Sequence, residues 1–110
     1  MDLELQDKII VVTGGSKGIG HAITNLLSDE KAIPFIVSRD KKSILNTVEQ
    51  IEKKGGKCSY ALAELTDPQQ GKEAIKKAIS EFGTIHGLVN NAGVNDGVGL
   101  QDGDVNRFVN

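Results

Sequence analysis

The chain has 110 residues and a formal net charge of −2, with 38% hydrophobic and 25% charged residues. This composition excludes a disordered or collagen-like chain and leaves room for one domain. The near balance of acidic and basic residues argues against nucleic acid or an anionic membrane as the main partner.

The chain opens with a predicted strand followed by an amphipathic helix. The β-branched run at residues 8–13 predicts a strand buried on both faces. Apolar residues then recur at helical spacing from about residue 18 to residue 30, which predicts a helix. The residues expected to face the sheet are Ile19, Ala22, Ile23, Leu26 and Leu27.

A second strand and a second helix come next. Residues 33–38 predict the strand, and Pro34 is tolerated near its start. Asp40 is expected to cap the helix, and Gly55-Gly56 is expected to stop it. The apolar face of this helix is expected to carry Ile44, Leu45, Val48 and Ile51.

A third unit and a final strand complete the pattern. Residues 57–62 predict a strand, Asp67-Pro68 predicts a helix start, and Gly83 predicts its end. Residues 87–90 predict a fourth strand, and a turn-rich loop follows from Gly93. The buried stripe of the third helix is expected at Ala74, Ile75, Ala78, Ile79 and Phe82.

Strands and helices therefore alternate, and no hairpin turn separates two strands. This order predicts an α/β protein with a parallel sheet and helices on both faces, joined by right-handed crossovers.

The lone Cys58 excludes an internal disulfide and is expected to be a packed, unreactive thiol in a reducing cytoplasm. The N-terminal residues are acidic, which is the wrong sign for a signal peptide, and no apolar run approaches the ~20 residues of a spanning helix.

A glycine-rich loop joins the first strand to the first helix, with the spacing G-x-x-x-G-x-G. Gly14 suits a tight exit turn, Gly18 a close approach to a pyrophosphate, and Gly20 close packing of the helix on the strand. Backbone N–H groups at the helix N-terminus would then hold the anion. Lys17 precedes its glycine, which excludes a phosphate-binding loop of the NTPase kind. The alternative is a glycine-rich turn without a ligand.

Two motifs stand out together: Thr-Gly-x-x-x-Gly-Ile-Gly at residues 13–20 and Asn-Asn-Ala-Gly at residues 90–93. In this order they resemble the short-chain dehydrogenase/reductase family. The resemblance extends over the whole chain and implies a Rossmann-type doubly wound parallel sheet, truncated to its first mononucleotide-binding half plus a fourth strand. Residues 89–100 and the opening residues 1–8 also resemble sugar dehydrogenases of the L-fucose dehydrogenase type.

The end of the second strand bears on the choice of cofactor. Sites that prefer NAD commonly place a carboxylate there, about 20 residues past the glycines, to hold the ribose 2′-OH. Here the strand ends in Ser38-Arg39, and the guanidinium fork of Arg39 suits a 2′-phosphate. Lys17 adds a second cation, so NADP is favoured over NAD. The alternative is that both cations are solvated, with Asp40 paired to Arg39.

The resemblance implies contacts to the adenosine half of the cofactor as well. Glu64 and Leu65 occupy the place where the family has Asp-Val near the adenine. The motif at residues 90–93 resembles the one that braces the sheet and touches the adenosine ribose. The alternative is that buried asparagines there satisfy backbone groups. The full set of cofactor-binding candidates is Gly14, Ser16, Lys17, Gly18, Ile19, Gly20, Ser38, Arg39, Glu64, Leu65, Asn90, Asn91, Ala92 and Gly93.

No catalytic residue is assigned within the chain. The resemblance implies hydride transfer assisted by a tyrosine whose pKa a nearby lysine lowers, and by a serine. The only tyrosine is Tyr60, with Glu64 four residues on, so this pair is missing. His21 and His86 lack partners at metal-ligand spacing, and no metal site is expected.

We therefore expect residues 1–110 to be the N-terminal part of a single NAD(P)-binding Rossmann domain, with the catalytic half absent and the chain alone inactive. The parent enzyme would transfer hydride between NADP(H) and a secondary alcohol or carbonyl, with a sugar such as L-fucose as one candidate. It would be a cytoplasmic homo-oligomer without nucleic-acid or membrane partners. The alternatives are a non-catalytic nucleotide-binding module and an inactive fragment whose open sheet edge drives association.

Overall fold

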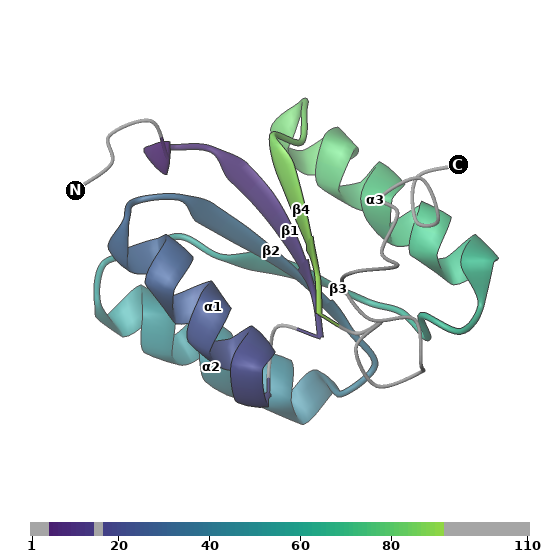
Figure 1. The fold of residues 1–110 in the computed structure, drawn as a ribbon, viewed down its shortest axis with the longest axis horizontal. Helices are drawn as coiled ribbons and strands as arrows, with labels where there is room; N and C mark the ends of the chain where they lie inside the picture. Colours follow the sequence, from purple (N-terminus) through teal and green to yellow (C-terminus); the bar gives the residue numbers. More distant parts are fainter. Residues whose placement is uncertain (1–4, 15–16, 92–110) are drawn as a thin grey trace.

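The computed structural model describes residues 5–14 and 17–91, drawn in colour in Figure 1. Its elements are β1 (Ile9–Thr13), α1 (Gly18–Asp29), β2 (Ile33–Ser38), α2 (Lys41–Lys53), β3 (Ser59–Leu62), α3 (Pro68–Phe82) and β4 (Gly87–Asn90). The predicted alternation is confirmed, with β3 beginning two residues later than expected. The loop expected after Gly93 lies outside the described residues.

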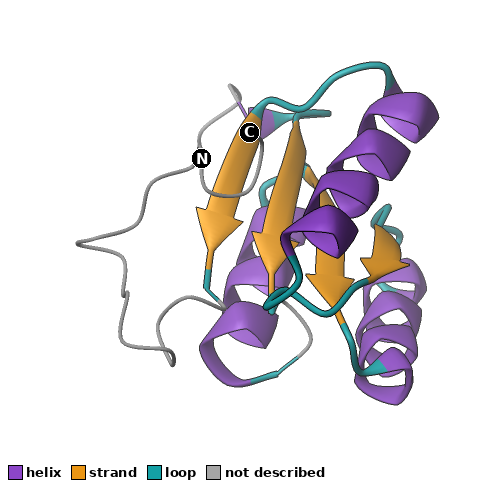
Figure 2. Cartoon of the chain, turned by 90° about the vertical axis from the view of Figure 1, so that its right-hand side faces the viewer, coloured by secondary structure: helices purple, strands orange, loops and turns teal. Residues whose placement is uncertain are grey.

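The strands form one parallel sheet in the order β3-β2-β1-β4. Figures 1 and 2 show α1 and α2 on one face of this sheet and α3 on the other. The predicted α/β class, with helices on both faces of a parallel sheet, is confirmed. The strand β1 lies between β2 and β4, so the chain leaves β1 toward one side and later returns to its other side.

The two central strands are apolar up to their last residues, Thr13 and Ser38, because helices cover both of their faces. Pro34 fits into β2 since the pairing with β3 begins only at Phe35. The amide of Ile33 donates to the carbonyl oxygen of Lys8, on the β1 side. Since successive backbone N–H groups of a strand point to opposite sides, the nitrogen of Pro34 points to the β3 side, where the pairing has not yet begun. The missing N–H of Pro34 therefore leaves no gap in the ladder.

Each face of the sheet carries its own apolar cluster. The cluster under α3 includes Phe35 of β2, which meets Phe82 edge to face with ring centroids 6.3 Å apart. The other buried residues of that cluster are Val11, Val37, Ala61, Ala63, Ala74 and Ala78. The cluster under α1 is smaller and is built on Ile10, Val12 and Ala32.

The predicted inward face of α1 is partly wrong. Ile19 and Leu26 are 69% and 63% exposed, and the residues buried in this helix are Gly20, Thr24 and Ser28. Small residues spaced by four form the buried row because the α1 backbone approaches β1 closely at Gly20, as described below. The larger side chains at positions 19 and 26 are thereby turned outward. Leu45 of α2 and Ile79 of α3, also expected inside, are likewise exposed.

The helix ends follow the sequence signals. The Asp40 carboxylate accepts a hydrogen bond from the amide of Ser43, and Asp67 accepts one from the amide of Gln69. Gly83 ends α3 with a φ of 84°, in the left-handed region that favours glycine. None of the three helices that the structure describes has the length and apolarity that crossing a bilayer requires.

Candidate functional site

The residues singled out by sequence gather at the carboxyl edge of the sheet. The strand register places Thr13 beside Val37 and Asn90, and Ser38 beside Leu62. The loops that leave this edge carry Gly14, Lys17, Arg39, Glu64 and Asn91. Because β2 and β4 flank β1 on opposite sides, the edge contains a topological switch point, where α/β sheets bind ligands. Ser16, Ala92 and Gly93 lie outside the described residues.

The glycine turn holds the start of α1 against the end of β1. Gly14 and Gly18 have φ values of 68° and 52°, a conformation that side chains disfavour. A Cβ atom at position 20 would collide with the carbonyl oxygen of Gly14 and would lie 2.8 Å from Nδ2 of Asn91. The close helix–strand packing expected at Gly20 is therefore present, and it rests on backbone contact.

The N-terminus of α1 differs from those of α2 and α3. Lys17, its N-cap residue, is extended and makes no side-chain cap hydrogen bond, whereas Asp40 and Asp67 cap the other two helices. The first turn of α1 contains no acidic residue, as is also true of α2 and α3. What distinguishes α1 is that the N–H groups at its positive end meet the sheet edge without a capping carboxylate, which suits an anion. This part of the site fits the pyrophosphate of a dinucleotide.

Asparagines at the end of β4 tie that strand to β1. The Thr13 Oγ1 atom lies 3.2 Å from Oδ1 of the buried Asn90 and 3.3 Å from the carbonyl oxygen of Val89. Nδ2 of Asn91 donates to the carbonyl of Gly14 over 3.4 Å. The expected bracing of the sheet by Asn90 and Asn91 is thus present, and a contact to the ribose stays a prediction.

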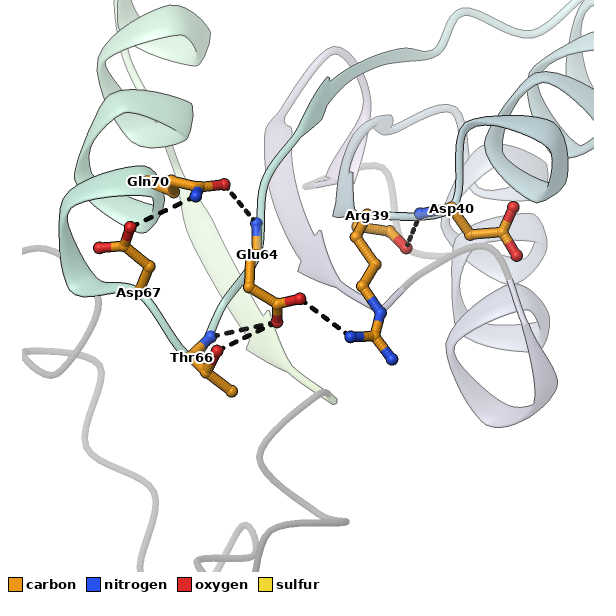
Figure 3. A network of polar contacts seen from close by, with 7 residues as sticks. Arg39, Asp40, Glu64, Thr66, Asp67 and Gln70 are labelled. Atoms are coloured by element: carbon orange, nitrogen blue, oxygen red, sulfur yellow. Dashed lines mark hydrogen bonds and ion pairs between the residues drawn. The ribbon is translucent and has the colours of Figure 1, made fainter.

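Both cations expected near a 2′-phosphate are paired with carboxylates. Nζ of Lys17 lies 2.7 Å from Oδ2 of Asp40, and Nη1 of Arg39 lies 2.9 Å from Oε2 of Glu64. Figure 3 shows Arg39 extended toward Glu64, with the Asp40 side chain turned the other way. The suggested Asp40–Arg39 pair is therefore wrong. The Lys17 and Arg39 side chains are 67% and 78% exposed, so both stay open to a ligand.

The two carboxylates are held by more than their cations. The pKa of Asp40 lies well below its usual range, first because of the Lys17 ammonium and then because of the Ser43 amide and hydroxyl. The pKa of Glu64 is lowered by Arg39 first and by the Thr66 amide next. The backbone N–H of Glu64 donates to Gln70 over 2.7 Å, which fixes the loop after β3 (Figure 3).

Acid is expected to weaken the fold through these carboxylates. Their folded pKa values lie below the ordinary value of about 4, so their ion pairs stabilise the chain above that pH and are lost as the pH falls through the folded pKa. We expect the urea denaturation midpoint to fall between about pH 5 and about pH 3. Asp40→Asn, which keeps a good N-cap residue, should show a smaller fall. Equal falls in the two proteins would contradict this role of Asp40.

The remaining site candidates contribute less to this edge. Leu65 is half-buried and packs on the cluster under α3, while Ile19 is exposed at the start of α1. Ser38 accepts a hydrogen bond from the amide of Asp40 over 3.3 Å, so its hydroxyl helps to shape the turn that presents Arg39. Asp40 was predicted as a helix cap and, in the alternative, as the partner of Arg39; its contact with Lys17 was not predicted, because it depends on how the two helix starts meet.

The histidines and the cysteine make structural contacts. Nδ1 of His86 must accept from the amide of Ile9, since that amide has only a proton to give. His21 bridges Thr47 of α2 and Asn25 of α1. Burial raises the pKa of the Cys58 thiol to about 12, in keeping with a packed side chain. Within residues 5–14 and 17–91, no group of three His, Cys, Asp or Glu residues is placed to hold a metal ion.

A parallel sheet with a glycine turn, an uncapped helix start and polar side chains at its switch point defines the class of dinucleotide-binding α/β folds. The family model described as short chain dehydrogenase matches residues 8–110. The chain therefore belongs to the short-chain dehydrogenase family. Members of this family are oxidoreductases that use an NAD(P) cofactor, and the choice between NADP and NAD is a separate question.

Individual relatives support the same membership. The chain is 34% identical over 92 residues to the 3-oxoacyl-(acyl-carrier-protein) reductase FabG of Thermotoga maritima, covering 84% of this chain and 37% of FabG. It is 38% identical over 101 residues to the short-chain dehydrogenase/reductase FrzI of a Cladobotryum species, covering 89% and 38%. The curated relatives compared are longer proteins, of which the chain spans between 36% and 46%.

Solved structures show the same fold. The citronellol catabolism dehydrogenase of Pseudomonas aeruginosa PAO1 superimposes with a TM-score of 0.77 at 31% identity, covering 82% of this chain and 38% of that protein. A short-chain type dehydrogenase/reductase of Mycobacterium ulcerans gives a TM-score of 0.74 at 28% identity, covering 79% and 33%. The matched region is the first part of a Rossmann-like sheet.

Proposed function

We propose that residues 1–110 form the cofactor-binding N-terminal part of a single Rossmann domain in an NADP(H)-dependent oxidoreductase. The observation that carries this proposal is the uncapped N-terminus of α1, packed through Gly20 against the end of β1 at the switch point of the sheet. The exposed cations Lys17 and Arg39 on the same edge support NADP over NAD.

Each part of the site has its own role in this proposal. The amides at the start of α1, together with Ser16, would hold the pyrophosphate, and Lys17, Ser38 and Arg39 would hold the 2′-phosphate. Glu64 and Leu65 would border the adenine, and residues 90–93 would border the ribose. When bound, the nicotinamide supplies the hydride donor or acceptor. The groups that move a proton would lie outside residues 1–110.

Replacing Arg39 tests the choice of cofactor. Arg39→Ala is expected to lower the ratio of NADP⁺ to NAD⁺ affinity by about tenfold or more, because hydrogen bonds to charged groups contribute about 1.5–3 kcal/mol. Isothermal titration with each dinucleotide measures the ratio. Lys53→Ala is the matched control, since it removes one positive charge from the far end of α2. An unchanged ratio in Arg39→Ala would show that NADP is not selected through this residue.

The substrate class is part of the same proposal. A secondary alcohol or its carbonyl follows from the family, and a sugar such as L-fucose is suggested by the sequence of residues 89–100, most of which lie outside the described residues. NADPH formation with L-fucose, measured on the protein with its catalytic half, tests the substrate.

We further propose that the whole protein is a cytoplasmic homo-oligomer. If the 110-residue chain binds no NADP⁺ at millimolar concentration, the alternative of an inactive fragment is favoured.

A further inference from the structure

We infer that Asp40 and Glu64 set the strength of NADP selection, because each carboxylate competes with a 2′-phosphate for a cation of the site. This inference rests on the proposed function, in which Lys17 and Arg39 bind that phosphate. It assigns to Asp40 and Glu64 a role that neither helix capping nor adenine binding includes. The two carboxylates would act as specificity-determining residues that weaken the preference for NADP.

The pair at Lys17 is built around a fixed acceptor. Besides the contact of 2.7 Å with Lys17, the Asp40 carboxylate accepts from the amide of Ser43 at 3.1 Å and from its hydroxyl at 3.0 Å. These bonds hold the carboxylate at the start of α2 whether or not Lys17 stays. A phosphate that shares the ammonium would therefore approach within a few ångströms of a fixed negative charge, which repels it.

The pair at Arg39 occupies one arm of the guanidinium fork. Nη1 donates to Oε2 of Glu64, and the other carboxylate oxygen of Glu64 accepts from the hydroxyl of Thr66 at 3.2 Å (Figure 3). Thr66 and the backbone bond to Gln70 keep Glu64 in place beside the arginine. A bidentate phosphate contact uses two donors of the guanidinium, so a phosphate that engages Nη1 has to displace Glu64.

Charge adds to this competition. Each of the two ion pairs is formally neutral, so a phosphate with a charge near −2 meets no net positive charge from either pair. A 2′-hydroxyl carries no charge and is insensitive to this balance. Removing one carboxylate charge should therefore raise the affinity for a nucleotide with a 2′-phosphate relative to the affinity for the same nucleotide with a free 2′-hydroxyl.

Amide substitutions provide the test, since they remove charge and keep size. Asn is as good an N-cap residue as Asp, so Asp40→Asn retains the start of α2. Gln at position 64 keeps an oxygen that accepts from Thr66. Glu49→Gln is the control: it neutralises the partner of Lys53 within α2, in an ion pair of the same kind away from the carboxyl edge.

The probes are adenosine 2′,5′-bisphosphate and adenosine 5′-monophosphate, which differ only by the 2′-phosphate. We expect Asp40→Asn and Glu64→Gln each to raise the ratio of their affinities about twofold to fivefold, the range expected for exposed ion pairs, as measured by isothermal titration. The double variant should give about the product of the two increases. Any contact of Glu64 to the adenine cancels in this ratio, because both probes carry adenine.

The outcomes separate the inference from the proposal on which it rests. A ratio that falls or stays the same in both amide variants, while Arg39→Ala lowers it, overturns the competition and leaves NADP selection standing. If the wild-type ratio is near one and no variant changes it, both the inferred competition and the proposed selection of NADP are overturned. An increase in Glu49→Gln equal to those at the site would assign the effect to overall charge and overturn the inference. Circular dichroism of each variant establishes that the fold is retained.

Discussion

Gly20→Ala is expected to lower the free energy of unfolding by roughly 2–3 kcal/mol and to abolish dinucleotide binding. The added Cβ atom would collide with the carbonyl oxygen of Gly14, a backbone atom that cannot move aside without opening the turn. Opening the turn separates α1 from the end of β1 and moves the uncapped amides away from the site. Urea denaturation and titration with NADP⁺ measure the two effects.

Gly71→Ala is the matched control for this change. Gly71 lies inside α3, its φ is not among the positive values of the described residues, and a Cβ atom there would meet no atom within 4 Å. The same substitution should therefore stabilise the chain by up to about 1 kcal/mol, the difference in helix propensity between Ala and Gly. If both variants lost stability equally, the close contact at Gly20 would not be the cause.

Phe35→Ala is expected to destabilise the chain by about 4 kcal/mol. Phe35 is fully buried in β2, packs edge to face on Phe82, and belongs to the larger of the two apolar clusters. A domain of this size has a total stability of about 5–15 kcal/mol, so much of the chain would be unfolded or close to it. Urea denaturation at two temperatures, or in a stabilising salt, would measure the loss.

Leu62→Ala serves as the control for Phe35→Ala, because it truncates a large side chain of the same sheet that is exposed. Leu62 ends β3 and is about half exposed, so Leu62→Ala should cost less than about 1 kcal/mol. The contrast tests whether the cluster between the sheet and α3 carries the stability of the chain. A loss below about 1.5 kcal/mol in Phe35→Ala would show that it does not.

The order of elements was predictable because each depends on local signals. The apolar run of β2 and the Asp-Pro start of α3 are readable within a few residues, and both lie where the sequence indicated. The inward face of α1 was predicted in part incorrectly. Periodicity assigns every apolar side chain of a helix to the core, whereas the contact at Gly20 that orients α1 involves backbone atoms and has no hydropathy signal.

The candidate site was likewise predictable in part. Its members were identifiable from motif spacing, but their partners depend on which strands are neighbours. Glu64 meets Arg39 because β3 lies next to β2, and this adjacency comes from the sheet order. Asp40 meets Lys17 because the first turns of α1 and α2 lie side by side at the same edge. Pairwise contacts between loops are properties of the assembled sheet, and the sequence of each loop alone does not specify them.

The brace between β4 and the glycine turn also bears on the order in which the protein folds. The contacts from Thr13 to Asn90 and from Asn91 to Gly14 each join residues 77 positions apart. Contacts of such long sequence separation close late, because the entropy of the intervening chain must be lost first. We therefore expect Gly14, at the end of β1, to acquire its contact with Asn91 only after β4 has docked on β1. A part of the site encoded before β2 thus depends on a strand encoded after α3.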